Sequence, residues 1–213
     1  MFTVDRSAPD KPTFTATVPG SPANDNTPLV QGDAAGQVQL YTSADCSGAP
    51  IASGTSAEFS GPGIAVAVAD DTTTTFWATV TDAGGKSSGC SWGGITYVEE
   101  STVRASATAK RKQRRSGKKI AVQAKVKAQE ESDAKARGKV EFGGKSYKLK
   151  RQTKSVSSGK SKNLKLRLKR PKDARRIAKA LDQGKKAVAR ITVKLIDEVG
   201  NVEAESFRVK LKR

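Results

Sequence analysis

The charged side chains of this chain are divided so unevenly that a single uniform domain is excluded. Residues 1–100 contain three basic and eleven acidic side chains, a net charge of −8, whereas residues 101–213 contain the other 36 basic and 10 acidic ones, a net charge of +26. A sign reversal of this size marks the boundary between two modules with different surfaces. We place the boundary near Glu99–Thr102, which gives domains at 8–100 and 101–213, each about 100 residues long and so of ordinary domain size.

The composition excludes several classes of protein. The chain has no His, which removes the His-based catalytic triads and the commonest metal ligand, and its two Cys cannot complete a four-ligand zinc site. No apolar run approaches the roughly 18 residues that a membrane-spanning helix needs. The glycine-rich motifs that bind phosphate, and the G-x-S-x-G motif that presents a nucleophilic serine, do not occur between a predicted strand and a predicted helix. Carboxylate pairs such as Glu130–Glu131 are adjacent in sequence, whereas the two carboxylates of a glycosidase face each other across a cleft. We therefore expect neither an enzyme nor a cofactor.

Short segments rich in Val, Thr and aromatic residues fill residues 8–100. They are separated by Gly, Pro, Asn and Asp clusters, and none has helical periodicity. This pattern predicts an antiparallel β-sandwich. The expected strands are Phe14–Thr17, Val38–Tyr41, Ile64–Val68, Thr75–Val80 and Ile95–Val98.

An ordered set of motifs in this half resembles the bacterial immunoglobulin-like repeats that occur in tandem in large secreted or cell-surface proteins. The motifs are Asp5–Pro9, Ser21–Pro28, Leu40–Tyr41 with Cys46–Gly48, Thr73–Phe76, and Asp82–Gly85 followed by Cys90–Ser91. The resemblance departs at one turn, where the usual D-x-x-G-N reads Asp82-Ala83-Gly84-Gly85; glycine also tolerates the positive φ that Asn would supply. The resemblance implies an immunoglobulin-like sandwich, an extracellular location and neighbouring repeats as partners.

The opening of the chain also fits a tandem arrangement. Thr3–Ser7 is similar to the end of the same module, Tyr97–Ser101. We expect residues 1–7 to be the tail of a preceding repeat or a linker, so that the chain would be part of something longer.

In a secreted sandwich of this kind Cys46 and Cys90 would form one disulfide. It would close a loop of 44 residues and place the protein in an oxidising compartment. The alternative is two reduced thiols in a cytosolic protein; a redox role would require a C-x-x-C pair, which is absent.

Several acidic residues raise the question of calcium. Calcium requires six to eight converging oxygen ligands, and no D-x-D-x-D loop is present. We expect solvated turn carboxylates and no metal site. The residues concerned are Asp5, Asp33, Asp70, Asp71 and Asp82.

The second half is dominated by strict alternation of apolar and polar residues. In Ile120–Lys127, Leu164–Lys169, Ile191–Ile196 and Phe207–Lys212 every second residue is apolar and most of the others are basic, which predicts strands with one buried and one cationic face. Adding Val103–Ala109, Lys139–Phe142 and Ser146–Lys150 gives about seven strands and a second antiparallel β-sandwich. We therefore expect an all-β chain of two antiparallel sandwiches in tandem.

One helix, at about 172–183, is expected to interrupt this second sandwich. Pro171 suits a first helical turn, Gly184 suits the position after the end, and Ala174, Ile177, Ala178 and Leu181 share one face. The turn Asp197–Asn201 has the D-x-x-G-N pattern of the last hairpin in immunoglobulin-like folds. With the helix, it makes this half resemble terminal β-sandwich modules of actinobacterial surface proteins.

The densest run of positive charge predicts a polyanion-binding loop. It lies between two expected strands, where a hairpin loop would project, and comprises Lys110, Arg111, Lys112, Arg114, Arg115, Lys118 and Lys119. A cationic surface attracts nucleic acid, phosphate-bearing cell-wall polymers or acidic polysaccharide with salt-dependent affinity, although it can also serve solubility alone. Only Phe142, Tyr147 and Phe207 could stack on bases, which argues against sequence-specific nucleic-acid recognition.

Together these features predict a non-enzymatic structural or adhesive module of a bacterial extracellular protein. The acidic domain would act as a stalk or spacer, and the basic domain would contact anionic cell-envelope polymers or polysaccharide. Two alternatives remain open: a nucleic-acid or general polyanion-binding protein, and an accessory module of a larger secreted enzyme.

Overall fold

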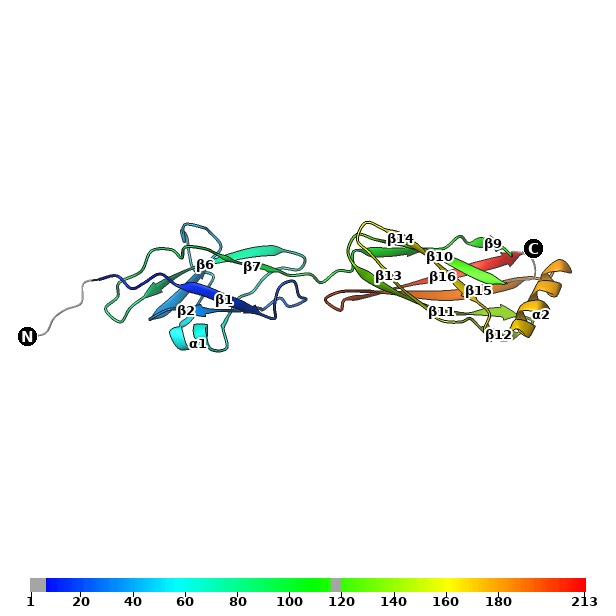
Figure 1. Cartoon of the computed structure of the whole chain (residues 1–213), viewed down its shortest axis with the longest axis horizontal. Helices are drawn as coiled ribbons and strands as arrows, with labels where there is room; N and C mark the ends of the chain where they lie inside the picture. Colours follow the sequence, from blue (N-terminus) through cyan, green and yellow to red (C-terminus); the bar gives the residue numbers. More distant parts are fainter. Residues whose placement is uncertain (1–6, 116–119) are drawn as a thin grey trace, which may run out of the picture. The chain divides into compact units, whose positions relative to one another are not determined.

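The computed structural model describes residues 7–115 and 120–213 and divides the chain into two compact units, Met1–Ser101 and Thr102–Arg213 (Figure 1). Both units are mostly β. The predicted tail of a preceding repeat falls almost wholly on residues 1–6, which lie outside the described residues. Each unit is therefore considered by itself.

The first unit has two antiparallel sheets that bury a shared core. One sheet has the strand order β1-β2-β5 and the other β4-β3-β6-β7. The elements are β1 (Thr13–Val18), β2 (Leu29–Asp33), β3 (Gln37–Tyr41), β4 (Ala52–Thr55), α1 (Ser56–Ser60), β5 (Ile64–Ala65), β6 (Thr73–Thr81) and β7 (Ile95–Val98). Val30 of the first sheet and Leu40, Phe76 and Tyr97 of the second are fully buried in the same cluster, which makes the unit sandwich-like.

The predicted disulfide is present in the first unit. Cys46, in the loop after β3, is bonded to Cys90, in the segment between β6 and β7, and their Cα atoms lie 5.6 Å apart. The bond joins residues 44 positions apart in the sequence. It therefore ties together two long loops of the β4-β3-β6-β7 sheet.

The strands β2 and β4 and the one-turn helix α1 of this half were not predicted, and the predicted strand Ile64–Val68 is shorter, as β5. The Thr55 hydroxyl accepts a hydrogen bond from the Glu58 N–H, and the Glu58 carboxylate accepts one from the Thr55 N–H, so a capping box begins the helix. Phe59 is fully buried and meets Phe14 edge-on, with ring centroids 5.9 Å apart. A side chain at Gly32 of β2 would collide with the Phe59 ring, so glycine is required there.

The second unit has a three-stranded sheet, β14-β10-β8, and a six-stranded sheet in which β12, β11, β15, β16 and β9 follow in order and β13 also pairs with β11. Its elements are β8 (Ala105–Thr108), β9 (Lys112–Arg114), β10 (Ala121–Ala128), β11 (Ser132–Phe142), β12 (Lys145–Lys148), β13 (Gln152–Val156), β14 (Ser161–Arg167), α2 (Pro171–Asp182), β15 (Ala187–Asp197) and β16 (Val202–Lys212). Apolar residues of both sheets form one buried cluster.

The predicted alternation is confirmed in the second unit. Val122 and Val126 of β10, Leu164 of β14 and Val193 of β15 are fully buried, while the basic residues between them are exposed. The predicted helix is also confirmed as α2, and its face of Ala174, Ile177, Ala178 and Leu181 packs against the core (Figure 1). The register of buried residues therefore leaves the outer face of each sheet to the charged side chains.

Two details of the second unit differ from the prediction. The strand β9 pairs with β16 in parallel, so the expectation of an antiparallel arrangement is wrong for this pair. Neither β9 nor β13 was expected as a strand, and the predicted strand Lys139–Phe142 is only the end of the long strand β11. Both β9 and β13 consist mainly of polar residues, and their sequences therefore lack the alternation that identifies a half-buried strand.

The two units share one turn geometry. In the first, the Asp82 carboxylate accepts a hydrogen bond from the Lys86 N–H at 2.9 Å, and in the second the Asp197 carboxylate accepts one from the Asn201 N–H at 2.7 Å. The third residue after each Asp, Gly85 or Gly200, has φ of +78° or +94°. The positive φ therefore falls on glycine in both turns, and Lys86 occupies the position of the expected Asn.

Candidate polyanion-binding surface

Part of the predicted basic cluster forms the edge strand β9 instead of a projecting loop. Lys112 lies opposite Lys210 and Arg114 opposite Lys212 in the parallel ladder with β16. The Gln113 side chain turns the other way, donating to the Gln123 carbonyl at 2.7 Å and accepting from its N–H at 2.8 Å. This pairing connects β9 to β10 in the other sheet, so Lys112 and Arg114 are held on the outer surface.

The cluster residues have different roles. Lys110, Arg111, Lys112 and Arg114 are exposed. Arg115 is partly buried and forms an ion pair with Asp182 at the end of α2, where it helps to fix the helix. Lys118 and Lys119 lie outside the described residues.

Basic side chains cover the outer face of the six-stranded sheet, here called the cationic face. Register places these side chains on one side of the sheet, because all of them are exposed and occupy alternate positions of paired strands. The cationic face comprises Lys112, Arg114, Lys135, Arg137, Lys139, Lys148, Arg190, Lys194, Arg208, Lys210 and Lys212, with the carboxylates of Asp133 and Glu141 on the same face.

Four of these side chains form a continuous row across four strands. Lys148 of β12 is paired with Lys139 of β11, Lys139 with Arg190 of β15, and Arg190 with Arg208 of β16. Neighbouring strands are about 4.8 Å apart, so the row extends over about 14 Å. Like charges directly opposite each other in a sheet destabilise it, each pair by up to about 1 kcal/mol. The row is therefore an energetically unfavourable arrangement for the isolated fold.

A groove of about 560 Å³ lies along this row. Arg137, Lys139, Lys148, Arg151, Arg190 and Arg208 line it, together with the Thr192 and Ser206 hydroxyls, which are hydrogen-bonded to each other at 3.1 Å. The groove lies where β12 ends and β13 begins along β11, so that Arg151 of the connecting segment reaches it. A side chain at Gly138 would collide with the Arg190 carbonyl and approach the Ile191 Cγ2 to 2.8 Å, so glycine permits the close pairing of β11 and β15 here.

Glu141 is the acidic neighbour of the groove. Its two oxygens lie 3.0 Å from the Lys139 Nζ and 3.1 Å from the Arg190 Nε. Hydrogen bonds from Lys139 first, and then from Arg190, lower the pKa of Glu141, which keeps it ionised at neutral pH. Within the described residues, Arg137, Lys148, Arg151 and Arg208 have no carboxylate partner, so most of the charge in the groove is uncompensated.

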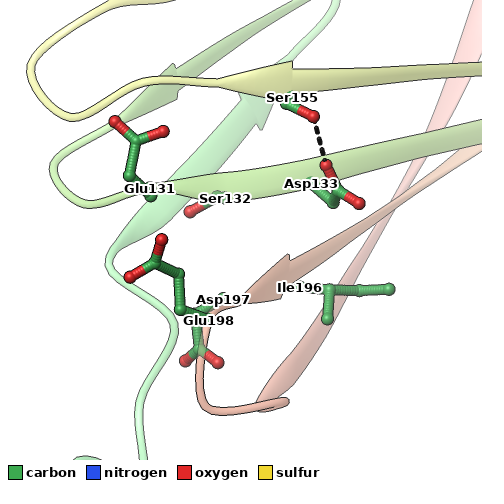
Figure 2. A pocket seen from close by; sticks show the side chains of 7 residues that line it. All are labelled: Glu131, Ser132, Asp133, Ser155, Ile196, Asp197 and Glu198. Atoms are coloured by element: carbon green, nitrogen blue, oxygen red, sulfur yellow. Dashed lines mark hydrogen bonds between the residues drawn. The ribbon is translucent and has the colours of Figure 1, made fainter. Parts of the chain in front are cut away.

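A separate acidic pocket lies at the other end of the cationic face, near the turn between β15 and β16. Figure 2 shows that Glu131, Asp133, Asp197 and Glu198 surround it. Three of these carboxylates accept bonds from nearby groups: Asp133 from the Ser155 hydroxyl at 2.6 Å, Glu131 from the Ser158 N–H at 2.9 Å, and Asp197 from Asn201. These carboxylates therefore bind protein donors in turns and, for Asp133, between β11 and β13, and the rest of the face is positive.

Three of the acidic residues considered for calcium in the first unit accept hydrogen bonds from protein donors. Asp70 accepts from the Asn26 amide at 2.8 Å, Asp71 from the Ser101 N–H at 3.1 Å, and Asp82 from Lys86. Asp5 lies outside the described residues. Among residues 7–115 and 120–213, no three His, Cys, Asp or Glu side chains are grouped so that they could hold a metal ion.

Neither described helix is long and apolar enough to cross a membrane.

Sequence reasoning found one edge of the cationic face and missed the groove. Lys112 and Arg114 were predicted to contact a polyanion, and they lie on the same face as the groove. The residues that form the row come from four different strands. The alternation within one strand shows which of its side chains share a face, but it does not show which residue of the next strand lies opposite. The row could therefore not be predicted from the sequence.

Comparisons with known proteins add little. No family model matches the chain, and no curated protein matches it. Among 29 solved chains that are similar is the crystal structure of a protein from Archaeoglobus fulgidus. It is 18% identical, and the match covers 50% of this chain and 90% of that one with a TM-score of 0.29, a likeness that supports no argument about fold family or function.

Proposed function

We propose that this chain is a non-enzymatic module of a bacterial extracellular or cell-surface protein and that its second unit contacts anionic polymers of the cell envelope. The cationic face carries the proposal, because its register aligns Lys148, Lys139, Arg190 and Arg208 despite their mutual repulsion. A polyanion laid along the row would neutralise these charges and release its own counterions.

The first unit would act as a spacer. The motifs quoted above, its two-sheet core and the Asp82 turn that it shares with the second unit support an immunoglobulin-like repeat. The Cys46–Cys90 disulfide supports an oxidising, extracellular location, because cytosolic thiols are kept reduced. We expect neighbouring repeats of the same kind to be its partners within the parent protein.

The face favours a flexible anionic polymer over nucleic acid. The described residues that project from the cationic face include no aromatic side chain on which bases could stack; Phe207 is partly buried against the core. Binding would therefore rest on charge and hydrogen bonding to the backbone of the polymer.

The test measures binding of the full chain to a purified polyol phosphate polymer from a bacterial cell wall and to duplex DNA over a salt series. We expect the cell-wall polymer to be bound at physiological salt. For about five neutralised phosphates at roughly 0.7 counterions each, the affinity should fall with salt with a log–log slope of about −3.5. Loss of binding above low salt would contradict the proposal and leave a spacer with a solubilising surface. Tighter binding of DNA would favour the nucleic-acid alternative.

A further inference from the structure

We infer that the groove lined by Arg137, Lys139, Lys148, Arg151, Arg190 and Arg208 is a discrete site for consecutive phosphate groups of a polyol phosphate chain, which it distinguishes from carboxylate polymers. This inference rests on the proposed function and adds to it a defined location and ligand chemistry.

The first argument is the type of the donors. Four of the six basic side chains that line the groove are arginines, whose planar guanidinium donates paired hydrogen bonds that match two oxygens of a phosphate. Elsewhere in residues 101–213, only nine of the other 30 basic residues are arginines, and lysine supplies most of the positive charge. Arginine is therefore enriched in the groove, where the geometry of hydrogen bonding to a ligand matters.

The second argument is the direction of the donors. Arg137 comes from β11, Arg151 from the segment between β12 and β13, Arg190 from β15 and Arg208 from β16, while the Thr192 and Ser206 hydroxyls also line the groove. Several donors from separate strands line one open groove, so they can bind different oxygens of the same group. A phosphate has more acceptor oxygens than a carboxylate and can therefore satisfy more of these donors at once.

The third argument is size. The groove has a volume of about 560 Å³ and follows a row of about 14 Å. A single small anion displaces only a few water volumes of about 30 Å³ each, so the space fits several linked groups. The row thus offers successive cations to successive phosphates along one chain.

Glu141 provides the sharpest test, because it competes with the ligand. Its carboxylate binds Lys139 and Arg190, two of the residues that would hold phosphate. Glu141→Gln should free both and strengthen phosphate binding severalfold. Asp133→Asn is the matched control: it removes the same charge from the same face, but Asp133 lines the acidic pocket and bonds to Ser155.

A second pair of variants tests the groove directly. Arg190→Gln with Arg208→Gln removes two adjacent cations of the row. Lys125→Gln with Lys165→Gln removes the same charge from exposed positions of β10 and β14 in the other sheet. All four substitutions change exposed side chains, and the far-UV circular dichroism melting curve of each variant confirms folding.

Binding is measured by calorimetry on the full chain at physiological salt in a phosphate-free buffer. The probes are inorganic tripolyphosphate, the cell-wall polyol phosphate polymer, a glutamate oligomer of equal charge and a single-stranded oligonucleotide. The inference predicts that tripolyphosphate and the polymer bind at least tenfold tighter than the glutamate oligomer. It also predicts that the arginine pair variant loses at least tenfold in affinity and that the lysine pair variant changes by less than twofold.

The outcomes separate the inference from the proposed function. If both pair variants weaken polymer binding equally, or the glutamate oligomer binds as well as tripolyphosphate, the discrete site is refuted while the envelope contact stands. If the oligonucleotide binds more tightly than the polyol phosphate polymer, the inference is overturned in favour of nucleic acid. If tripolyphosphate binds in the groove but the cell-wall polymer does not, the groove binds phosphate, but both its assignment to a polyol phosphate chain and the envelope contact fail.

Discussion

The Cys46–Cys90 bond makes a quantitative prediction about the first unit. Replacing both residues by serine opens a loop of 44 residues in the unfolded chain. In the chain-entropy model, a loop of this length corresponds to about 13 cal/mol/K, or about 4 kcal/mol at 25 °C. We therefore expect the free energy of unfolding of the first unit to fall by up to about 4 kcal/mol, a large share of the 5–15 kcal/mol typical of a domain.

The chain contains its own reporter for this measurement. Both of its tryptophans, Trp77 and Trp92, belong to the first unit, so fluorescence follows the unfolding of that unit alone. At about 1–2 kcal/mol per molar urea, the fluorescence midpoint should fall by about 2–4 M. Both units contribute to the circular dichroism signal, and the transition in it that fluorescence does not show belongs to the second unit. Its midpoint should not change, because the second unit contains no cysteine.

Reduction of the unsubstituted protein is the control. It should lower the fluorescence midpoint as far as the serine pair does, and reductant should not affect the serine variant. A loss below about 1 kcal/mol would refute the entropic reasoning, since the unfolded loop would then already be restricted. An equal loss in both units would show that they do not unfold independently.

Three further predictions concern single positions. Phe59→Ala should destabilise the first unit by about 3–5 kcal/mol in the same fluorescence assay, because it empties a fully buried site. Gly138→Ala should destabilise the second unit by about 1–3 kcal/mol in circular dichroism melts and weaken phosphate binding, because the new Cβ would force β11 and β15 apart beside Arg190; unchanged stability would contradict the close approach. Burial, followed by the carboxylates of Asp25 and Glu99, raises the pKa of Tyr97 above 10.0. The folded state therefore favours the neutral ring, so the contribution of Tyr97 to stability is constant below about pH 10 and declines above it. Urea midpoints measured above about pH 10 should therefore fall less in Tyr97→Phe than in the unsubstituted protein.

The parts of the fold that could be predicted are those in which one strand face is buried. Val122 and Val193 alternate with polar residues along β10 and β15, and this period identifies a strand without knowledge of its partner. The helix α2 could be predicted for the same reason, since Ile177 and Leu181 recur at helical spacing.

The parts that were missed depend on partners distant in the sequence. β4 reads Ala-Ser-Gly-Thr and β9 reads Lys-Gln-Arg, and both are strands because of the neighbours they pair with rather than their own composition. The helix α1 is too short for a periodic pattern, although Thr55 and Glu58 have the spacing of a capping box. Attention to that spacing would have identified the helix.

Solubility alone does not account for the arrangement of charge on the cationic face. A solvated surface needs net charge, and the second unit could carry it on loops or in alternation with Ser and Thr. The structure instead pairs Lys139 with Lys148 and with Arg190, and Arg190 with Arg208, at a cost of roughly 1–3 kcal/mol for three neighbouring pairs. Among the described residues, Glu141 alone forms ion pairs with members of the row, and it offsets part of this repulsion from beside the groove. Aligned cations become favourable when an anion lies along them, because one ligand then relieves every repulsive pair at once. The register of four strands is therefore a stronger indication of a bound polyanion than the net charge of the whole chain.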